Sequence, residues 1–550
     1  MAPRALSVAA PRGATDDPRA LWLCRAVLIV ATLLVFSPVF SAEFVTWDDP
    51  DYVVNNALLR SAEGLHKIWS PFGSGLPQYY PLVFSSYWIE YHLWGASPAG
   101  YHIVNVLLHV ANALLVLELV RELGVSLWVA AGAAALFAVH PVQVESVAWV
   151  TERKNTLSGL FYLLCFLGYL RHRQTGRWGF YAAALAAFAA ALLSKTQTVT
   201  LPVVIALTEW VLQSTKRLCP LSLGAVAARL VPMVLLAGAA GMLTAQIERQ
   251  VAPAWVELPT LIQRVLIAAT APWFYAANFL LPVQLAPIYP KWQVVVTNPL
   301  WWAGLVACVL AIAAVFTWRQ RIGGLVLWGL GQFVLAMAPA LGLLPFTYLN
   351  YSYVADRFVY LSCLGAGVVV AVLVARAVEW RPAWRRSARV AAAVAVVVYG
   401  LLAFRQAGYW RTNLGFWTHA VARNPDAYPP NINLGNIYSS QGQWGEALPF
   451  YETASALQPR NTYALATYLD ALRRVRGPQA VADACTTHIA GGYVNAYVAY
   501  LQRAVSYEAL GRRAEALADY DQVLAQTRAG SASWQQARQG RERLGHATGQ

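Results

Sequence analysis

Apolar residues fall in long, nearly uninterrupted runs over the first three quarters of the chain. Runs of about 17–25 residues recur up to residue 405, and the rest of the chain has an ordinary mixture of polar and apolar side chains. At a rise of about 1.5 Å per residue in an α-helix, each run is long enough to cross the hydrocarbon core of a bilayer. We therefore expect an all-α, multi-pass membrane domain followed by a second domain outside the bilayer.

The pattern predicts eleven spans. They cover residues 21–42, 99–120, 126–146, 155–170, 179–194, 197–213, 225–245, 299–318, 323–341, 358–376 and 389–405, within a membrane domain of residues 21–405. A further apolar stretch, 259–281, is predicted to be an interfacial or re-entrant helix. Counting it as a span would move the basic loop at Arg319 and Arg321 to the wrong side.

Charge follows the same pattern. The net charge is +14, although only 12% of residues are charged, and the basic residues gather before the first span and in alternate loops. This distribution is typical of cytoplasmic loops, and it argues against a nucleic-acid partner. We expect a cytoplasmic N-terminal tail at 1–20 in the inner membrane of a bacterium. An odd number of spans then puts the C-terminal domain in the periplasm.

The C-terminal domain, predicted at 412–530, carries a repeat. From Tyr428 the offsets of a 34-residue helix-turn-helix repeat recur, with Gly435, Ala447 and Pro459 among them. Ala516 follows Ala447 by two periods, which indicates three repeats, the middle one degenerate. Such an array either binds a peptide or partner protein, or serves as a cap or dimerisation unit. Residues 531–550 are polar and are predicted to be a flexible tail.

The long first outer loop, predicted at 43–98, contains paired carboxylates. Asp48 and Asp49 follow the first span closely, where they can act as a general base or bind a cation beside a membrane-bound substrate. The alternative is that they cap a helix or are solvated loop residues. The six cysteines show no disulfide or metal-ligand spacing.

Further polar groups lie at the predicted outer ends of spans. One set lies on one face of the second span and comprises His102, Asn105, His109 and Asn112. A dense cluster comes between the third and fourth spans and comprises His140, Glu145, Glu152, Arg153, Lys154 and Asn155. Lys195 and Asp356-Arg357 add charges where an anionic lipid headgroup would lie. The alternatives are a polar seam between helices and cations that reach to lipid phosphates in general.

Together these motifs resemble a known family. The likeness rests on Trp47-Asp48-Asp49, Pro98 through His109, His140-Pro141 through Trp149, Ser194-Lys195, Ile288 through Trp292, Ala355-Asp356-Arg357 through Leu361, and the C-terminal repeats. The chain resembles the transmembrane and tetratricopeptide repeat-containing proteins and their bacterial relatives. That family belongs to the GT-C, protein O-mannosyltransferase-like glycosyltransferases.

The resemblance implies an inverting transferase of hexosyl or mannosyl type. Its donor would be a polyprenyl-phosphate-linked sugar, and its acceptor a protein hydroxyl or a surface glycan on the outer face, with a protein partner possible on the repeats. It implies Asp48 and Asp49 as catalytic residues, with Asp48 as the base. Lys195, Arg357 and Arg153 would bind the donor phosphate, and the substrate pocket would comprise His102, His140, Glu145, Glu152, Asp356, Tyr289 and Lys291.

No cofactor is firmly implied, although Mg²⁺ or Mn²⁺ at Asp48 and Asp49 is consistent with the pattern. Two other functions compete with the transferase. A membrane-anchored repeat scaffold would leave the outer charges without a purpose, and a single span would serve as its anchor. A transporter of lipid-linked glycans would require polar groups at the bilayer midplane on several helices, whereas here they gather at one end.

Overall fold

The structure is a computed structural model that describes residues 17–72, 75–76, 78–215, 217–251, 259–344 and 346–546. Within those residues the secondary structure is helical, with no strand, so the predicted all-α fold is confirmed. The chain divides into two compact units, Met1–Phe416 and Trp417–Gln550. Residues 1–16, most of the predicted N-terminal tail, lie outside the described residues.

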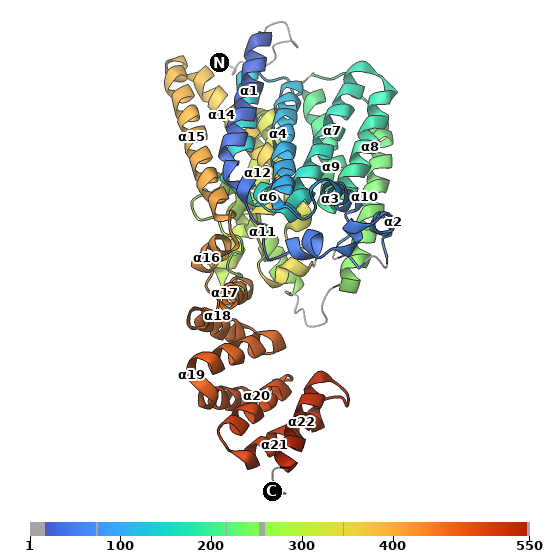
Figure 1. The fold of residues 1–550 in the computed structure, drawn as a ribbon. Coiled ribbons are helices and arrows are strands. Elements are labelled where there is room, and N and C mark those ends of the chain that lie inside the picture. The colour runs from blue at the N-terminus through green and yellow to red at the C-terminus, as the bar shows by residue number, and fades with distance from the viewer. Residues whose placement is uncertain are drawn as a thin grey trace. The chain divides into compact units, whose positions relative to one another are not determined.

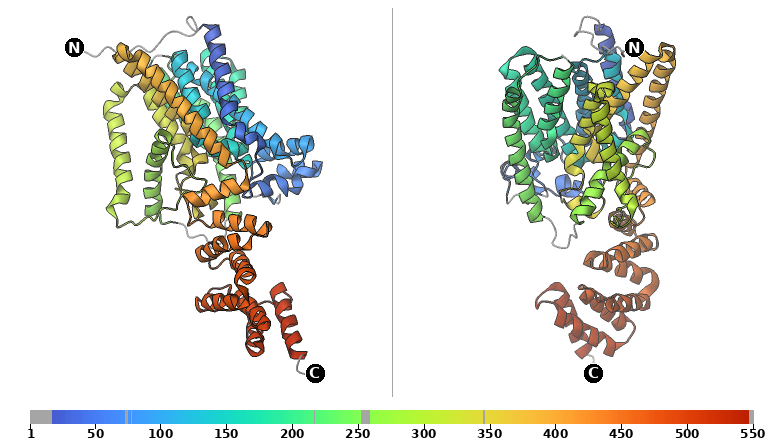
Figure 2. Two further views of the ribbon diagram at one scale, coloured as in Figure 1. Left: turned by 60° about the vertical axis from the view of Figure 1, so that its left-hand side comes forward. Right: turned by 180° about the vertical axis from the view of Figure 1, so that it is seen from behind.

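The first unit is a bundle of long helices (Figure 1), seen from two further sides in Figure 2. Each of the eleven predicted spans coincides with a helix. These are α1 (Pro18–Val35), α4 (Pro98–Glu122), α5 (Leu127–Val139), α7 (Arg153–Thr175), α8 (Trp178–Ser194), α9 (Leu201–Ser214), α10 (Leu223–Val251), α12 (Ala303–Ile322), α13 (Gly324–Met337), α14 (Ser362–Trp380) and α15 (Arg385–Tyr409).

Among the described residues, six helices are by themselves long and apolar enough to cross a membrane: α1, α4, α10, α12, α14 and α15. Helix α5 and the short α6 (Val144–Ala148) form a pair bent by 49°, which makes a seventh if the pair is one span. The bend falls at His140-Pro141, because Pro141 has no N–H for the helical ladder. Helix α11 (Leu261–Leu280), predicted to be interfacial, is not among these apolar helices.

Basic residues from several predicted cytoplasmic loops meet at one end of this bundle. Arg25 in α1 pairs with Glu118 near the end of α4, and Arg121 donates to the same carboxylate at 2.8 Å. Arg171, near the end of α7, lies 3.4 Å from Glu122. The start of α1 and the ends of α4 and α7 are therefore neighbours, as a bundle with alternating directions requires.

The long first outer loop folds into a packed layer of its own. It contains α2 (Ala62–Ile68) and α3 (Pro81–Trp94), and its buried core includes Tyr52, Phe84 and Tyr87 together with Tyr101 of α4. Tyr87 donates from its hydroxyl to the carbonyl of Val150 at 2.7 Å. The loop is thereby fixed to the segment that precedes α7.

The second unit is built from helix pairs. It includes α17 (Tyr428–Ser440), α18 (Trp444–Leu457), α19 (Thr462–Ala490), α20 (Ala496–Ala509) and α21 (Arg513–Gln526). Helix α19 is two helices joined at Gly477, whose φ of 82° breaks the helix, so it supplies the degenerate middle pair. A Cβ added at Gly435 would lie 2.6 Å from the Tyr451 ring, which explains the small residue there.

The predicted flexible tail is wrong in the described residues. Residues Ala532–His546 form helix α22, which packs on α21. Ala537 is fully buried in the cluster around Tyr520, and Gly540 lies against the Tyr520 ring. The polar composition conceals this packing because two small residues, three apart, make the contact.

Candidate functional site

Four segments bring charged residues together at the end of the bundle where α7 begins. They are the 3-10 helix η5 (Val150–Glu152), the first turn of α7, the turn after α8 and the 3-10 helix η10 (Asp356–Val359). The basic residues Arg171 and Arg173 lie in the last turns of α7. The charged connections and the basic loops are therefore at opposite ends of this helix.

Arg357 and Glu145 form the first contact of the site. The Arg357 guanidinium pairs with one carboxylate oxygen of Glu145, and its backbone N–H donates to the other at 2.9 Å. Both side chains are buried. Charge-assisted bonds of this kind are strong where water is excluded, so the pair fixes η10 on α6.

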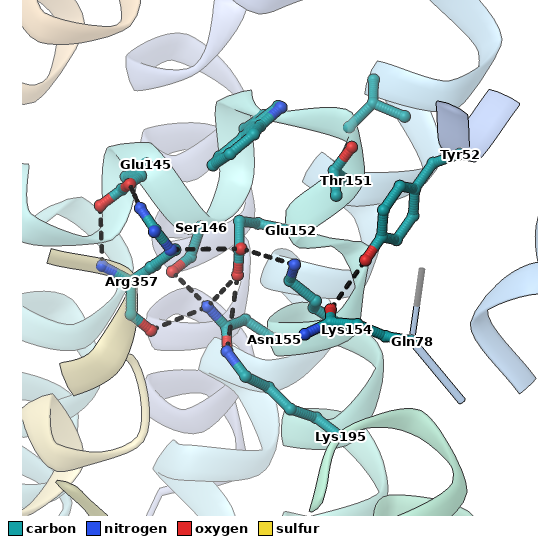
Figure 3. A network of polar contacts seen from close by, with 12 residues as sticks. Tyr52, Gln78, Glu145, Ser146, Thr151, Glu152, Lys154, Asn155, Lys195 and Arg357 are labelled. Atoms are coloured by element: carbon teal, nitrogen blue, oxygen red, sulfur yellow. Dashed lines mark hydrogen bonds and ion pairs between the residues drawn. The ribbon is translucent and has the colours of Figure 1, made fainter. Parts of the chain in front are cut away.

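Glu152 lies between three cations (Figure 3). Its carboxylate is 3.1 Å from Lys154 Nζ, 3.6 Å from Lys195 Nζ and 3.6 Å from Arg357 Nε, and the side chain has no exposed surface. Burial by itself would raise the pKa of Glu152, but the charges of Lys154, Lys195 and Arg357 together bring it below its ordinary value.

Asn155 links the cations to Glu152. Its amide nitrogen donates to Glu152 at 2.7 Å and to the Arg357 carbonyl at 2.8 Å, and its amide oxygen accepts from Lys195 at 2.6 Å. Burial lowers the pKa of Lys195 to about 8, against the opposing effect of Glu152. This lysine is therefore close to losing its charge within the ordinary pH range.

A small hollow lies beside these groups. Its lining includes Lys195, Arg357, Asn155, Gln197 and Tyr360. Two cations thus face a space bounded mainly by hydrogen-bonding side chains, an arrangement that suits an anionic group such as a phosphate.

Asp48 and Asp49 have different surroundings. Asp49 is buried, and its two oxygens accept hydrogen bonds from the backbone N–H of Val45 at 2.8 Å, the backbone N–H of Thr151 at 3.0 Å and the Thr151 hydroxyl. Burial raises its pKa to about 7. Its carboxylate ties the first outer loop to η5.

Asp48 is half-buried and lies within the electrostatic reach of Lys154 and Arg357. Burial raises its pKa, and the two cations oppose that rise. Of the predicted catalytic pair, Asp48 is therefore the carboxylate that the structure brings to the cations.

Aromatic rings surround the Arg357 guanidinium. Its carbon lies 4.0 Å from the centroid of Tyr348, 5.7 Å from that of Trp47 and 5.5 Å from that of Trp149. Trp47 and Trp149 stack at 4.9 Å. Because Trp47 precedes Asp48 in the chain, this stack holds the carboxylate segment next to Arg357.

Arg153, predicted to bind the donor phosphate, is engaged elsewhere. Its guanidinium pairs with Glu90 of α3 and also donates to Asn105, to Ser86 and to the Tyr101 carbonyl. The side chain is fully buried, and each of its nitrogens already has a partner. The structure therefore gives Arg153 a different contact from the one predicted. Lys154, the next residue, is the one that joins the cluster.

The two predicted pocket histidines lie apart from the hollow. His140 stacks on Phe279 at 4.3 Å, and its ring nitrogens contact the Phe279 carbonyl at 2.8 Å and the Val142 N–H at 3.3 Å. The Nε2 atom of His102 lies 3.3 Å from the Glu43 carbonyl. Both rings are buried and fix the loops around the site.

The other predicted pocket residues form a second set of contacts. Tyr289 donates to Asp356 at 2.8 Å, and burial raises the pKa of Asp356 well above its ordinary value, with the Glu145 charge adding to the rise. Lys291 donates to the Asn350 carbonyl at 3.3 Å. Asp356 thus reaches the site through its neighbour Arg357, whereas Lys291 contacts the segment that precedes η10.

The predicted position for a divalent ion lies at Asp48 and Asp49, two carboxylates with different surroundings. The described residues contain no group of three or more His, Cys, Asp or Glu side chains placed to hold an ion. Both oxygens of Asp49 already accept hydrogen bonds.

Comparisons with known proteins agree with the two-part organisation. Residues 432–463 match the tetratricopeptide repeat family. The human Protein O-mannosyl-transferase TMTC4 is 26% identical over 498 residues, which cover 78% of this chain and 65% of the human protein. The mouse protein of that name is 35% identical over 175 residues, covering 28% of this chain and 24% of its own length.

Among solved structures, the chain is similar to ArnT from Cupriavidus metallidurans bound to undecaprenyl phosphate. The TM-score is 0.36 at 14% identity, and the match covers 86% of this chain and 80% of that one. The chain spans 65% of the length of the human relative. In sequence, the chain is thus similar to proteins named protein O-mannosyl-transferases and carries a tetratricopeptide repeat, which agrees with the resemblance that its motifs predicted.

Proposed function

We propose that the chain is a membrane glycosyltransferase that moves a sugar from a polyprenyl-phosphate-linked donor to a hydroxyl group. The names of its relatives support this class of reaction. The observation that carries the proposal is that Arg357, whose charge acts on Asp48, also lines a hollow together with Lys195. A base for the acceptor and a place for an anionic leaving group are thus available at one end of the bundle.

In the proposed reaction, the Asp48 carboxylate takes the proton of the acceptor hydroxyl. The hydroxyl oxygen then bonds to the anomeric carbon of the sugar as the bond from that carbon to the phosphate oxygen breaks. Attack from the face opposite the phosphate inverts the configuration. Arg357 and Lys195 stabilise the charge on the departing polyprenyl phosphate, since fixed charges in a dry site need no reorganisation during the reaction.

The reaction needs no metal bound to Asp49. The three hydrogen bonds to its carboxylate suit a structural residue that holds the loop bearing Asp48. The positive side chains of Arg357 and Lys195 supply the charge that a divalent ion would otherwise bring.

The proposed location is the inner membrane of a bacterium, with the N-terminus in the cytoplasm. Arg25, Arg121 and Arg171 gather around Glu118 and Glu122 at one end of the bundle. This supports the orientation, since cytoplasmic loops are enriched in Lys and Arg. Transfer then takes place on the outer face. A mannosyl or other hexosyl donor is proposed from the relatives, with a protein hydroxyl or surface glycan as acceptor and the repeats as the contact for a protein partner.

The test is sugar transfer by the purified full chain, in detergent or lipid nanodiscs, from synthetic polyprenyl-phosphate sugars to peptide and glycan acceptors. Loss of a general base costs roughly 10²–10⁴-fold, so Asp48→Asn should fall by about that factor. Asp51→Asn is the matched control, because Asp51 is an exposed carboxylate three residues further along the chain.

Asp51→Asn should keep activity within about twofold of wild type, since a solvent-exposed charge interacts weakly with the site. The wild-type rate should also fall at acid pH, through a pKa for Asp48 above its ordinary value of 3.8. An Asp48→Asn enzyme as active as Asp51→Asn would remove Asp48 from the mechanism.

A further inference from the structure

Two lysines approach Glu152 from different directions. Lys154 Nζ lies 3.1 Å from one carboxylate oxygen and Lys195 Nζ lies 3.6 Å from the other, and Figure 3 shows the two ammonium groups on separate sides of it. Arg357 Nε shares the Lys154 oxygen at 3.6 Å. One buried carboxylate therefore separates two like charges.

The surroundings of the two lysines differ as well. Lys195 lines the hollow together with Arg357, whereas Lys154 is not part of that lining. Lys154 Nζ instead lies 5.3 Å from the centroid of Tyr52, in the first outer loop, and its charge acts on Asp48. One lysine faces the space for an anion, and the other faces the carboxylate segment.

We infer that Glu152 is a positioning residue that divides the site, holding Lys195 toward the donor phosphate and Lys154 toward Asp48. This inference rests on the proposed function, because it assigns the two cations to its two halves. Lys195 and Arg357 serve the leaving group. Lys154 favours the ionised form of the base.

The geometry explains why a carboxylate is needed here. Two ammonium groups and a guanidinium within about 4 Å of one point repel strongly in a site without water, and a central negative charge offsets that repulsion. An ammonium group has three N–H donors. On Lys195, Asn155 accepts at 2.6 Å and Glu152 lies on a second side, which leaves the third donor for the hollow.

Glu152 also sets the charge of Lys195. Burial lowers the pKa of this lysine and the Glu152 carboxylate raises it, while the charges of Lys154 and Arg357 lower it further. Without the carboxylate, Lys195 loses its proton at a lower pH. Anion binding in the hollow should then fail at a pH where the wild type still binds.

The experiment measures binding of undecaprenyl phosphate, without sugar, to the purified full chain in detergent micelles. Lys195→Met should weaken binding by about 10- to 100-fold, the value of one charge-assisted hydrogen bond. Lys154→Met should change it by less than about threefold, because that lysine lies outside the hollow. Equal losses in the two variants would overturn the division of the site.

Glu152→Gln adds a pH measurement. Wild-type binding should weaken as pH rises through about 8, and the Gln variant should weaken at lower pH. The same pH dependence in both proteins would contradict the positioning role. If Glu152→Gln does not fold, the comparison of the two lysine variants still decides the division.

A transfer measurement separates this inference from the proposed function. In an active enzyme, kcat/KM falls on the acid side of its pH profile as Asp48 takes up a proton. Lys154→Met should move this acid limb to higher pH, because the Asp48 pKa rises. Lys195→Met should leave the acid limb in place. If the wild type binds undecaprenyl phosphate with the expected pattern but transfers no sugar, the transferase proposal fails and the phosphate half of the inference stands. If it transfers sugar and both variants shift the limb alike, the inference alone fails.

Discussion

The guanidinium and the backbone N–H of Arg357 both bind the carboxylate of Glu145, a residue 212 positions earlier in the chain. These two direct contacts join η10 to α6, and both residues are buried. Removing the carboxylate charge leaves a buried guanidinium whose remaining ion pair is the longer one with Glu152, at 3.6 Å. The pair therefore stabilises the fold of the site as well as its charge.

Glu145→Gln is expected to destabilise the protein by about 3 kcal/mol, because a broken buried pair leaves an uncompensated charge. Thermal unfolding in detergent measures this change. The control is Glu63→Gln, since Glu63 is 76% exposed and pairs only with Lys67 on one face of α2. That variant should unfold at the same temperature as the wild type, because an exposed ion pair contributes little to stability. Equal stability of the two variants would show that the Arg357 contact contributes nothing.

Asp49→Asn tests the buried carboxylate through the pH dependence of stability. Burial raises the pKa of Asp49 to about 7 in the folded protein, from 3.8. The folded state therefore holds a proton that the unfolded state releases between about pH 4 and pH 7. The stabilising contribution of this group is complete below about pH 4 and is lost as the pH rises through about 7.

Unfolding temperatures measured from pH 4 to pH 8 should accordingly fall with rising pH in the wild type. The fall should be smaller in Asp49→Asn, which cannot titrate at this position. Asp51→Asn serves as the comparison, since its exposed side chain keeps the wild-type slope. Parallel curves for wild type and Asp49→Asn would exclude Asp49 as the group responsible.

The different contacts of Arg153 and Lys154 show where prediction from sequence stops. Both residues belong to one charged run, and its sequence pattern does not indicate which of the two cations faces the site. The partner that draws Arg153 inward is Glu90, 63 residues earlier in a loop helix without a hydrophobic periodicity that would have fixed its position. Lys195 and Arg357, by contrast, lie next to the ends of predicted apolar spans, so their positions follow from the spans.

The same contrast holds for the fold. The spans were predictable because uninterrupted apolar runs of that length have no place in water. The first outer loop was not, because its core joins Tyr52 to Phe84 and Tyr87 of α3, two short segments that carry no repeat. Helix α22 was missed because the small residues Ala537 and Gly540 make its buried contacts. A segment of polar and small residues is predicted from composition to be a flexible tail.

Arg153→Met tests the corrected role of Arg153. The variant leaves Glu90 buried without its partner, which costs about 3–5 kcal/mol. The double variant Arg153→Met/Glu90→Gln should recover much of that loss, because the uncompensated charge is gone. Unfolding of the two single variants and the double variant gives the coupling energy. A residue that served only to bind the donor phosphate would instead weaken lipid-phosphate binding and show no coupling with Glu90.

Gly540→Ala tests the packing of α22 on α21. A Cβ at this position would lie 2.3 Å from the Tyr520 ring, and the Tyr520 hydroxyl is held by Glu508 at 2.7 Å, so the ring has no free direction in which to move. We expect the substitution to destabilise the C-terminal unit by about 1–3 kcal/mol, the usual effect of overpacking. Limited proteolysis should then release the last helix faster than from the wild type.

Gly445→Ala in α18 is the control, because nothing lies within 4 Å of its added Cβ. Alanine also favours a helix, so the proteolysis rate of this variant should equal or fall below that of the wild type. If Gly540→Ala resists the protease as well as Gly445→Ala does, α22 is not held by the Tyr520 contact.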